Sequence, residues 1–325
     1  MMLAAIDLGT VTSRLLIGEV NGGQVEVLKR SIIITDLGEG LAHSGRISDA
    51  AYERLVGALT QFSVDITQSE AELLNFGDIV GVMPRKIVAT SAMRDAANAS
   101  EVLGHLEDLG FLIEVISGSR EAELSFWGTL SGFPDFDSTV MSIDIGGGST
   151  ELIVGESGLP TSRKPRILTS HSFDVGSRRV TEMFLKSDPP KSHEIEKARK
   201  WIEGELVTFC SSLSHKPSEL IAVAGTATSA ITIRDRIKVY DSSAVHGKRM
   251  SAQELDAIIA TLAALPLEER RQVTGLHPGR APVIIGGLIT LAVLLSILGR
   301  DSVLVSDTDI LQGILLDEHS LLGAV

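Results

Sequence analysis

The sequence predicts an α/β protein built from two similar halves, and three observations carry this prediction. Segments typical of strands and of helices alternate along most of the chain, as they do in α/β folds. An aspartate followed by a glycine-containing loop occurs at Asp7 and again at Asp144, 137 residues later, which is about the length of one domain. The 325 residues are 44% hydrophobic and 22% charged, so the chain can fill one large core or two medium ones.

The first half begins with a strand and a hairpin. A short buried strand is expected over 3–7, and Asn21-Gly22-Gly23 is a strong hairpin signal between strands over 14–20 and 24–30. Apolar residues at helical spacing follow Ser48, a suitable N-cap, and predict a helix from there to about residue 65. The remaining elements expected here are strands over 31–35, 86–90 and 111–116 and a helix over 97–109.

The same order of elements restarts at residue 139. The expected strands are 139–145, 151–156, 167–173, 220–224 and 302–306. The expected helices are 177–186, 192–213, 252–264 and a closing helix from about 308, and Ser251 with Glu254 forms a capping box before the third of these. The polar connector 155–166 is interpreted as a hairpin loop rather than an interdomain linker. This repetition of one plan is the main feature of the chain.

Composition, charge and the one long apolar run exclude several classes of protein. A net charge of −13 argues against binding to nucleic acid. The single cysteine, Cys210, allows no disulfide framework and is expected to be a small buried residue rather than a nucleophile. The apolar run between Arg280 and Arg300 is isolated and opens with Pro282 and a glycine pair, so we expect a buried helix and no membrane association. With no signal-like N-terminus, the expected location is the cytoplasm.

The two aspartate–glycine loops have the composition of phosphate-binding turns. The second reads DIGGGSTE at 144–151, and the first is a looser version, DLGTVTSR at 7–14. A turn of glycine, serine and threonine presents backbone N–H groups to phosphate oxygens, and glycine allows close approach. A carboxylate at the end of the preceding strand can hold a hydrated Mg²⁺ beside that phosphate. Two such loops facing each other across a cleft would clamp a phosphate chain from both sides.

The two loops and several other stretches of the chain resemble those of known protein families. The paired loops resemble the actin-like ATPase superfamily, and the whole chain resembles the exopolyphosphatase / guanosine pentaphosphate phosphohydrolase (Ppx/GppA) family. The matching stretches occur in family order and cover nearly the full length: AAIDLGTVTSRLLI at 4–17, VATSAMRDAAN at 88–98, ISGSREAELSFWG at 116–128, SIDIGGGSTELIVG at 142–155, SFDVGSRRVTE at 172–182, AVAGTATSA at 222–230, VHGKRMSAQEL at 245–255, GRAPVIIGG at 279–287 and SDTDILQGILLDE at 306–318.

The resemblance implies a fold and a division into domains. It implies two actin-like (ribonuclease H-like) domains with an interdomain phosphate-binding cleft. We place the first domain at 1–121, with the closing helix, 308–325, packed back on it, and the second at 122–307. The length is that of the short, two-domain members of the family.

The resemblance also implies the residues of the site. Glu121 corresponds to the glutamate proposed as the general base, which deprotonates the water that attacks the terminal phosphorus. The alternative for Glu121 is a solvated residue at a helix start. The residues implied to bind substrate are Thr10, Ser13, Arg14, Arg94, Gly146, Gly147, Gly148, Ser149, Gly225, Thr226 and Arg280, and those implied to hold Mg²⁺ are Asp144, Glu151 and Asp7. Arg178 and Arg179 are weaker candidates for gripping a distal phosphate.

The expected function is Mg²⁺-dependent release of terminal phosphate from inorganic polyphosphate by attack of water. Guanosine pentaphosphate (pppGpp) is the alternative substrate. The rival functions are a kinase that uses ATP, for which the stretch 225–228 could be part of an adenosine pocket, a non-catalytic sensor of an alarmone or of polyphosphate, and, least favoured, a structural filament. A homodimer is suggested only by the habit of the family.

Three departures from the family pattern bear on substrate preference. Val11 follows Thr10 where asparagine is common, which removes one side-chain hydrogen bond. Arg120 stands where an acidic residue often precedes the general base. Pro282 follows Arg280-Ala281 where aspartate is usual. None of the three alters Glu121, Asp144 or the glycines.

Overall fold

The fold was analysed in a computed structural model, which describes residues 1–76, 82–157 and 164–322. The chain divides into two compact units. Unit 1 contains Met1–Ser131 and Ile310–Val325, and unit 2 contains Gly132–Leu159 and Pro165–Asp309. Unit 1 runs ten residues beyond the expected boundary at residue 121, to Ser131 at the end of a helix. The predicted cleft between the domains stays a prediction.

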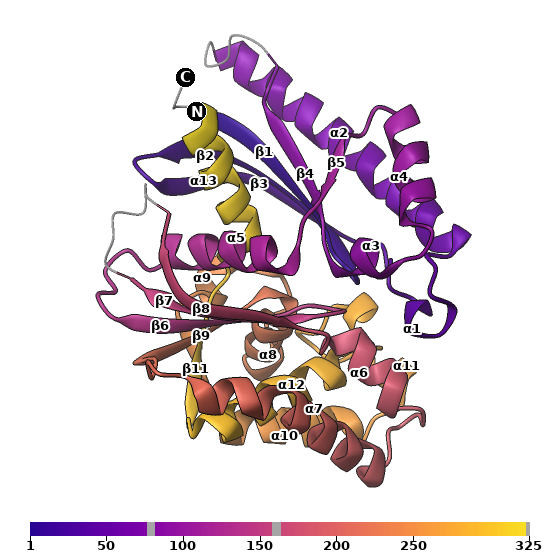
Figure 1. The fold of residues 1–325 in the computed structure, drawn as a ribbon. Coiled ribbons are helices and arrows are strands. Elements are labelled where there is room, and N and C mark those ends of the chain that lie inside the picture. The colour runs from indigo at the N-terminus through magenta and orange to yellow at the C-terminus, as the bar shows by residue number, and fades with distance from the viewer. Residues whose placement is uncertain (77–81, 158–163, 323–325) are drawn as a thin grey trace. The chain divides into compact units, whose positions relative to one another are not determined.

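Unit 1 is built on a five-stranded sheet in the order β3-β2-β1-β4-β5. β1 pairs antiparallel with β2 and parallel with β4 (Figure 1). Its strands are β1 (Met2–Leu8), β2 (Thr12–Asn21), β3 (Gln24–Ile34), β4 (Arg85–Ala89) and β5 (Ile113–Val115). Its helices are α1 (Leu41–Ser44), α2 (Asp49–Phe76), α3 (Ser91–Asp95), α4 (Ala99–Asp108), α5 (Gly118–Ser131) and α13 (Ile310–Leu322).

Helices cover both faces of the unit 1 sheet because the side chains of β1 alternate between two cores. Ile6 and Leu8 belong to a core shared with α2 and α4, whereas Leu3 and Ala5 belong to a core shared with α5 and α13. Figure 1 shows α13 and α5 on one side of these strands and α2 with α4 on the other. Since side chains alternate along a strand, Asp7 lies on the α5 face.

Unit 2 repeats this plan and extends it. Its six-stranded sheet has the order β10-β11-β9-β6-β7-β8, so β8-β7-β6-β9 corresponds to β3-β2-β1-β4. Its strands are β6 (Thr139–Ile145), β7 (Thr150–Glu156), β8 (Arg166–Phe173), β9 (Glu219–Val223), β10 (Lys248–Ser251) and β11 (Ser302–Val305). Its helices are α6 (Ser177–Phe184), α7 (Ser192–Ser212), α8 (Ala224–Arg234), α9 (Ser242–Val245), α10 (Ala252–Ala263), α11 (Leu267–Arg270) and α12 (Ile284–Leu298), with a 3₁₀ turn, η1 (Pro278–Arg280).

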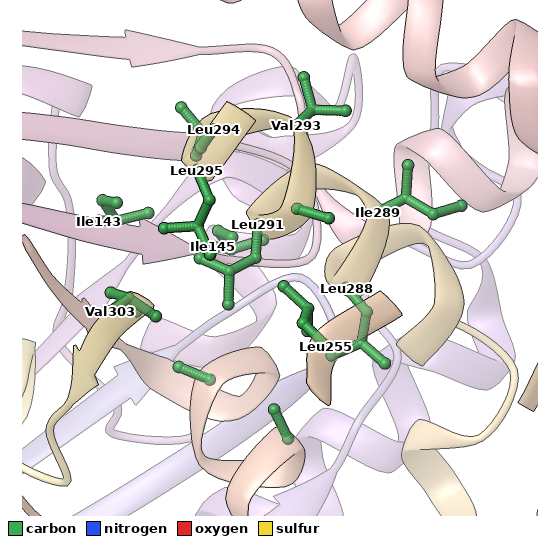
Figure 2. Packing of buried hydrophobic residues seen from close by; sticks show 14 of the residues in the cluster. Ile143, Ile145, Leu255, Leu288, Ile289, Leu291, Val293, Leu294, Leu295 and Val303 are labelled. Atoms are coloured by element: carbon green, nitrogen blue, oxygen red, sulfur yellow. The ribbon is translucent and has the colours of Figure 1, made fainter. Parts of the chain in front are cut away.

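The core of unit 2 surrounds α12, the apolar run of the sequence. Twelve of its residues are buried, which confirms the predicted buried helix. Figure 2 shows its leucines beside Ile143 and Ile145 of β6. These two isoleucines face the α12 core, so Asp144 between them faces the other side of the sheet. In the described residues, no helix is long and apolar enough to cross a membrane.

Local predictions for the described residues succeeded where a turn or cap decided the structure. The hairpin at Asn21-Gly22-Gly23 and the capping box of Ser251 and Glu254 are both present. The predicted separate strands 24–30 and 31–35 are wrong, because they form the single strand β3. The short elements α3 and β10 were not predicted. Residues 158–163, inside the predicted hairpin loop 155–166, and residues 323–325, at the end of the predicted closing helix, lie outside the described residues.

Candidate functional site

The unit 2 site is formed at the carboxyl ends of β6 and β9. These strands are parallel, and Asp144 lies directly opposite Val223 in their pairing. The loop 146–149 follows β6, and α8 follows β9 with Gly225 and Thr226 in its first turn. Thr226 Oγ1 donates to the carbonyl oxygen of Ile145 at 3.3 Å, which ties the two ends together. Parallel pairing therefore brings residues 144–149 next to residues 225–226, although they are far apart in the sequence.

The glycine loop has its carbonyl groups held by α6. The backbone N–H of Ser177 donates to Gly146 O at 2.9 Å, and that of Arg178 donates to Gly147 O at 2.9 Å. Arg179 Nε donates to Gly148 O at 3.0 Å. In a trans peptide the next residue's N–H points opposite to the C=O. The N–H groups of residues 147, 148 and 149 therefore all point away from α6.

Three successive amides directed to one side form a nest for an anion. Within the part of the chain that the structure describes, no hydrogen-bond acceptor is found for the N–H groups of Gly147, Gly148 or Ser149. Successive N–H groups of this kind bind phosphate oxygens in many proteins. The loop of the sequence motif can therefore bind phosphate through its backbone.

Two carboxylates lie beside this nest. Asp144 and Glu151 are directly opposite each other in the antiparallel pair β6–β7, so their side chains share one face of the sheet. They are 7% and 1% exposed, so both carboxylates are buried. Ser172 Oγ donates to Glu151 Oε1 at 2.6 Å. Like charges at opposed positions destabilise a sheet, and a cation bound between them relieves this repulsion.

These two carboxylates fit Mg²⁺ as a partial ligand set. Mg²⁺ prefers oxygen ligands, and it is commonly held by one or two carboxylates together with water and phosphate oxygens. Among the described residues, no group of three or more histidine, cysteine, aspartate or glutamate side chains is arranged to hold a metal ion. A Mg²⁺ at Asp144 and Glu151 would therefore take its other ligands from water and phosphate.

Arg280 lies over the first turn of α8. A Cβ added to Gly225 would stand 1.5 Å from Arg280 Nη1 and 2.0 Å from its Cζ, so only glycine leaves room for the guanidinium. The turn that carries Arg280 is capped by His277, whose Nδ1 accepts from the N–H of Gly279 at 3.1 Å. Ala224, just before Gly225, has a φ of +61°, which is uncommon for a residue with a side chain and is typical of functional sites.

In unit 1, the first hairpin pairs its aspartate with an arginine. Asp7 lies opposite Arg14 in the β1–β2 pair, and Arg14 donates to Asp7 Oδ2 from Nε at 3.0 Å and from Nη2 at 2.6 Å. Ser13 is fully buried, and its hydroxyl is 2.9 Å from that of Thr35. The predicted ligands Arg14 and Ser13 are thus both engaged within the hairpin and the segment that follows it.

The backbone of this first loop is held in the same manner as the second. The carbonyl oxygen of Thr10 accepts from Gly38 N at 2.9 Å, and that of Val11 accepts from Asp36 N at 3.0 Å. The N–H groups of Val11 and Thr12 therefore point away from the segment 35–38. Val11 is buried, so its place in the loop is that of a packing residue.

The predicted general base is paired with another predicted residue. Arg94, at the end of α3, donates from Nη1 to Glu121 Oε2 at 2.6 Å and to Ile116 O at 3.0 Å. Glu121 lies in the first turn of α5 and is 9% exposed, so it is not the solvated residue of the alternative interpretation. Arg120 points to other partners, because it pairs with Glu123 on α5 and with Asp317 on α13. This pairing accounts for a basic residue at position 120.

Cys210 and Pro282 take no part in the contacts of the two loops or of Glu121 described above. Burial raises the pKa of the Cys210 thiol to about 11, so it is protonated at neutral pH and a poor nucleophile. Pro282 lies in the turn between η1 and α12. Sequence reasoning gave Arg179 only a weak role and no role to Gly176, Ser172 or His277. The signal for Gly176 and Arg179 is the Gly176-Ser177-Arg178-Arg179 stretch after β8, and it does not extend to Ser172 or His277.

Comparison with known proteins identifies the family. The model of the Ppx/GppA phosphatase family matches residues 16–321. This chain belongs to the Ppx/GppA phosphatase family. It is 34% identical to exopolyphosphatase 2 of Mycobacterium tuberculosis, and the match covers 97% of each chain. The predicted family and enzyme class, a hydrolase that acts on phosphoanhydride bonds, are thereby confirmed.

Solved structures of Ppx/GppA proteins share the fold. The crystal structure of an exopolyphosphatase-like protein matches with a TM-score of 0.88 at 31% identity, over 99% of this chain and 98% of that one. The Ppx/GppA family member of Aquifex aeolicus matches with a TM-score of 0.78 at 26% identity, over 100% of this chain and 98% of that one. The predicted α/β fold of two actin-like domains is therefore confirmed.

Proposed function

We propose that this chain is an exopolyphosphatase, which releases the terminal phosphate of inorganic polyphosphate by attack of water and works in the cytoplasm. The observation that carries the proposal is the row of three N–H groups at residues 147–149, all directed away from α6. A polyphosphate chain offers a continuous line of anionic oxygens, which such a nest can bind without recognising a base or a sugar. The relative named exopolyphosphatase 2 supports this choice of substrate.

In the proposed reaction, Glu121 accepts the proton of the attacking water. The water oxygen forms a bond to the terminal phosphorus, the anhydride P–O bond breaks, and the shortened chain leaves as an oxyanion. Arg94 holds the carboxylate of Glu121 in one orientation through their 2.6 Å hydrogen bond. Mg²⁺, when bound by Asp144 and Glu151, would neutralise negative charge on the phosphates. The nest and Arg280 would hold the chain in place.

The test is phosphate release from long-chain polyphosphate and from pppGpp, with Mg²⁺ present. For Glu121→Gln we expect kcat to fall by about 10²–10⁴, the usual contribution of a general base. Arg94→Met should lower kcat by roughly tenfold, because the base loses its charge-assisted hydrogen bond. Glu123→Gln is the matched control on the same helix, since Glu123 pairs with Arg120, and it should stay within about twofold.

The outcomes separate the candidate functions. Faster release from polyphosphate than from pppGpp supports the proposal, and the reverse order makes the chain a pppGpp phosphohydrolase. Binding of polyphosphate by the wild type without any release would indicate a sensor. Full activity in Glu121→Gln would remove Glu121 from the role of base. Assembly into a homodimer, suggested by the family, can be measured in the same preparations by light scattering.

A further inference from the structure

The carbonyl groups of Gly146, Gly147 and Gly148 are not held in the same way. Gly146 O and Gly147 O accept from backbone N–H groups at the start of α6. Gly148 O accepts from a side chain, Arg179 Nε, at 3.0 Å. The direction of the Ser149 N–H, which shares a peptide plane with Gly148 O, therefore depends on a side chain that can be replaced while the backbone contacts remain.

The start of α6 is itself firmly placed. Gly286 of α12 lies so close that an added Cβ would stand 2.5 Å from Ser177 O. Gly176, just before the helix, contacts the loop directly, because an added Cβ would be 2.4 Å from Gly147 O. α6 is thus anchored on the buried helix α12 on one side and holds the loop on the other.

Arg179 is suited to hold a peptide rather than to reach into solvent. Its side chain is 25% exposed, and besides Gly148 O it contacts Asp174 Oδ1 at 3.5 Å. Glycine is the residue with the greatest backbone freedom, so the Gly148–Ser149 peptide turns easily once its carbonyl is released. Turning it would direct a carbonyl oxygen, in place of an N–H, toward the bound anion.

We propose that Arg179 is a positioning residue for the phosphate nest: it fixes the Gly148–Ser149 peptide so that the Ser149 N–H faces the phosphate chain. The inference rests on the proposed function, in that the loop is taken to bind phosphate. It assigns Arg179 to the loop backbone, whereas the sequence suggested a direct grip on a distal phosphate. The same reasoning makes Gly176 the second determinant of the loop's position.

The test is the binding of tripolyphosphate, measured by calorimetry in the Glu121→Gln background with Mg²⁺ present, where turnover is slow. Arg179→Met should raise Kd by about tenfold, as expected for the loss of one hydrogen bond from a charged donor. Arg179→Lys should raise it nearly as much, because lysine has a methylene group where arginine has Nε. In the otherwise wild-type enzyme, Arg179→Met should raise KM for polyphosphate and leave kcat within about twofold.

A second variant, Gly176→Ala, displaces the loop 146–149 by a steric contact instead of by the loss of a hydrogen bond. Gly176 has φ −134° and ψ 163°, which alanine adopts without strain, so Gly176→Ala acts only through its contact with the loop. It should also raise Kd by about tenfold, with Arg179 intact. The controls are Arg199→Met, which breaks a surface ion pair with Asp256, and Gly204→Ala, whose added Cβ meets nothing within 4 Å.

The outcomes divide clearly. The inference would be overturned if Arg179→Lys had a normal Kd for tripolyphosphate. It would also be overturned if the weaker binding of Arg179→Met, relative to its parent, disappeared at high salt. Either result would show that Arg179 acts through its charge. Unchanged binding in both Arg179→Met and Gly176→Ala would also overturn it, as would a lack of tripolyphosphate binding to the Glu121→Gln parent. If that parent binds and responds to these variants but the wild type releases no phosphate, the proposed function fails and the assignment of Arg179 stands.

Discussion

Asp7 and Asp144 occupy the same place in the two units, one residue before the end of a strand that opens a hairpin, yet their surroundings differ. Asp7 is opposite Arg14 and bound by it, whereas Asp144 is opposite Glu151. Unit 1 thus neutralises its aspartate within one hairpin. Unit 2 places two acids opposite each other, and Arg280, from a distant part of the chain, lies over the first turn of α8. One backbone plan therefore supports an ion pair in one unit and a candidate cation site in the other.

This difference divides the three acids that the family resemblance implies for Mg²⁺ into one paired with an arginine and two that lie opposite each other. Asp7 and Asp144 each precede a glycine loop and Glu151 follows one, and the resemblance implies that all three hold Mg²⁺. The two hydrogen bonds from Arg14 to one carboxylate oxygen give Asp7 a structural role within unit 1. We propose Asp144 and Glu151, which lie opposite each other on one face of the sheet, as the main protein ligands of the cation.

The largest expected effect comes from exchanging each aspartate for asparagine. Asp144→Asn should lower kcat by about a hundredfold and weaken the apparent affinity for Mg²⁺, because a cation contributes several kcal/mol to stabilising transferred charge. Asp7→Asn should leave the Mg²⁺ dependence unchanged. Phosphate release over a titration of Mg²⁺ checks both, and equal loss of Mg²⁺ affinity in the two variants would contradict the comparison.

In the absence of Mg²⁺, the free energy of unfolding should depend more on Asp7 than on Asp144. Asp7→Asn removes the charged acceptor of two hydrogen bonds from Arg14 and should lower the free energy of unfolding by about 1–3 kcal/mol. Asp144→Asn also removes one of two opposed carboxylates, so it should lower that free energy by about 1 kcal/mol less than Asp7→Asn does. Urea unfolding with EDTA present measures both values.

An intermediate effect should follow from the contact between Gly225 and Arg280. Gly225→Ala forces the guanidinium of Arg280 away from α8, and Arg280→Met removes it, so each should raise KM for polyphosphate by about tenfold. Because both changes act on the guanidinium of Arg280, the KM of the double variant should be close to that of each single variant. It should not be the product of the two separate increases. Multiplicative losses would mean that the two residues act separately.

The smallest expected effect concerns His277, which caps the turn of Arg280. Desolvation, and then the nearby charge of Arg280, lower the pKa of His277, although much of its side chain is exposed to solvent. The unfolded chain therefore binds more protons here than the folded protein, so this contribution to stability is present above pH 6.5 and decreases as the pH falls below it. His277→Asn keeps a capping side chain without titrating. Its Tm should fall less than that of the wild type between pH 7.5 and 5.5, and parallel curves would contradict this.

The sequence predicted those parts of the fold that depend on neighbouring residues. The hairpin at Asn21-Gly22-Gly23, the capping box at Ser251 and the buried helix 284–298 each follow from local turn chemistry or from apolar character. The boundary between the compact units lies ten residues beyond the expected one, because nothing in the sequence after Glu121 indicates that α5 continues to Ser131. α3 and β10 are too short to produce a periodic signal.

What the sequence by itself determined is the chemistry available: two aspartate–glycine hairpins, a family, and side chains such as Glu121, Arg94 and Arg280 that the resemblance implies for its site. Only the tertiary structure decided which charges meet. Arg14 is bound to Asp7, Glu151 lies opposite Asp144, and Arg179 holds Gly148 O. Strand register and helix packing set these partners, and both depend on contacts between residues distant in the sequence, which no local pattern records.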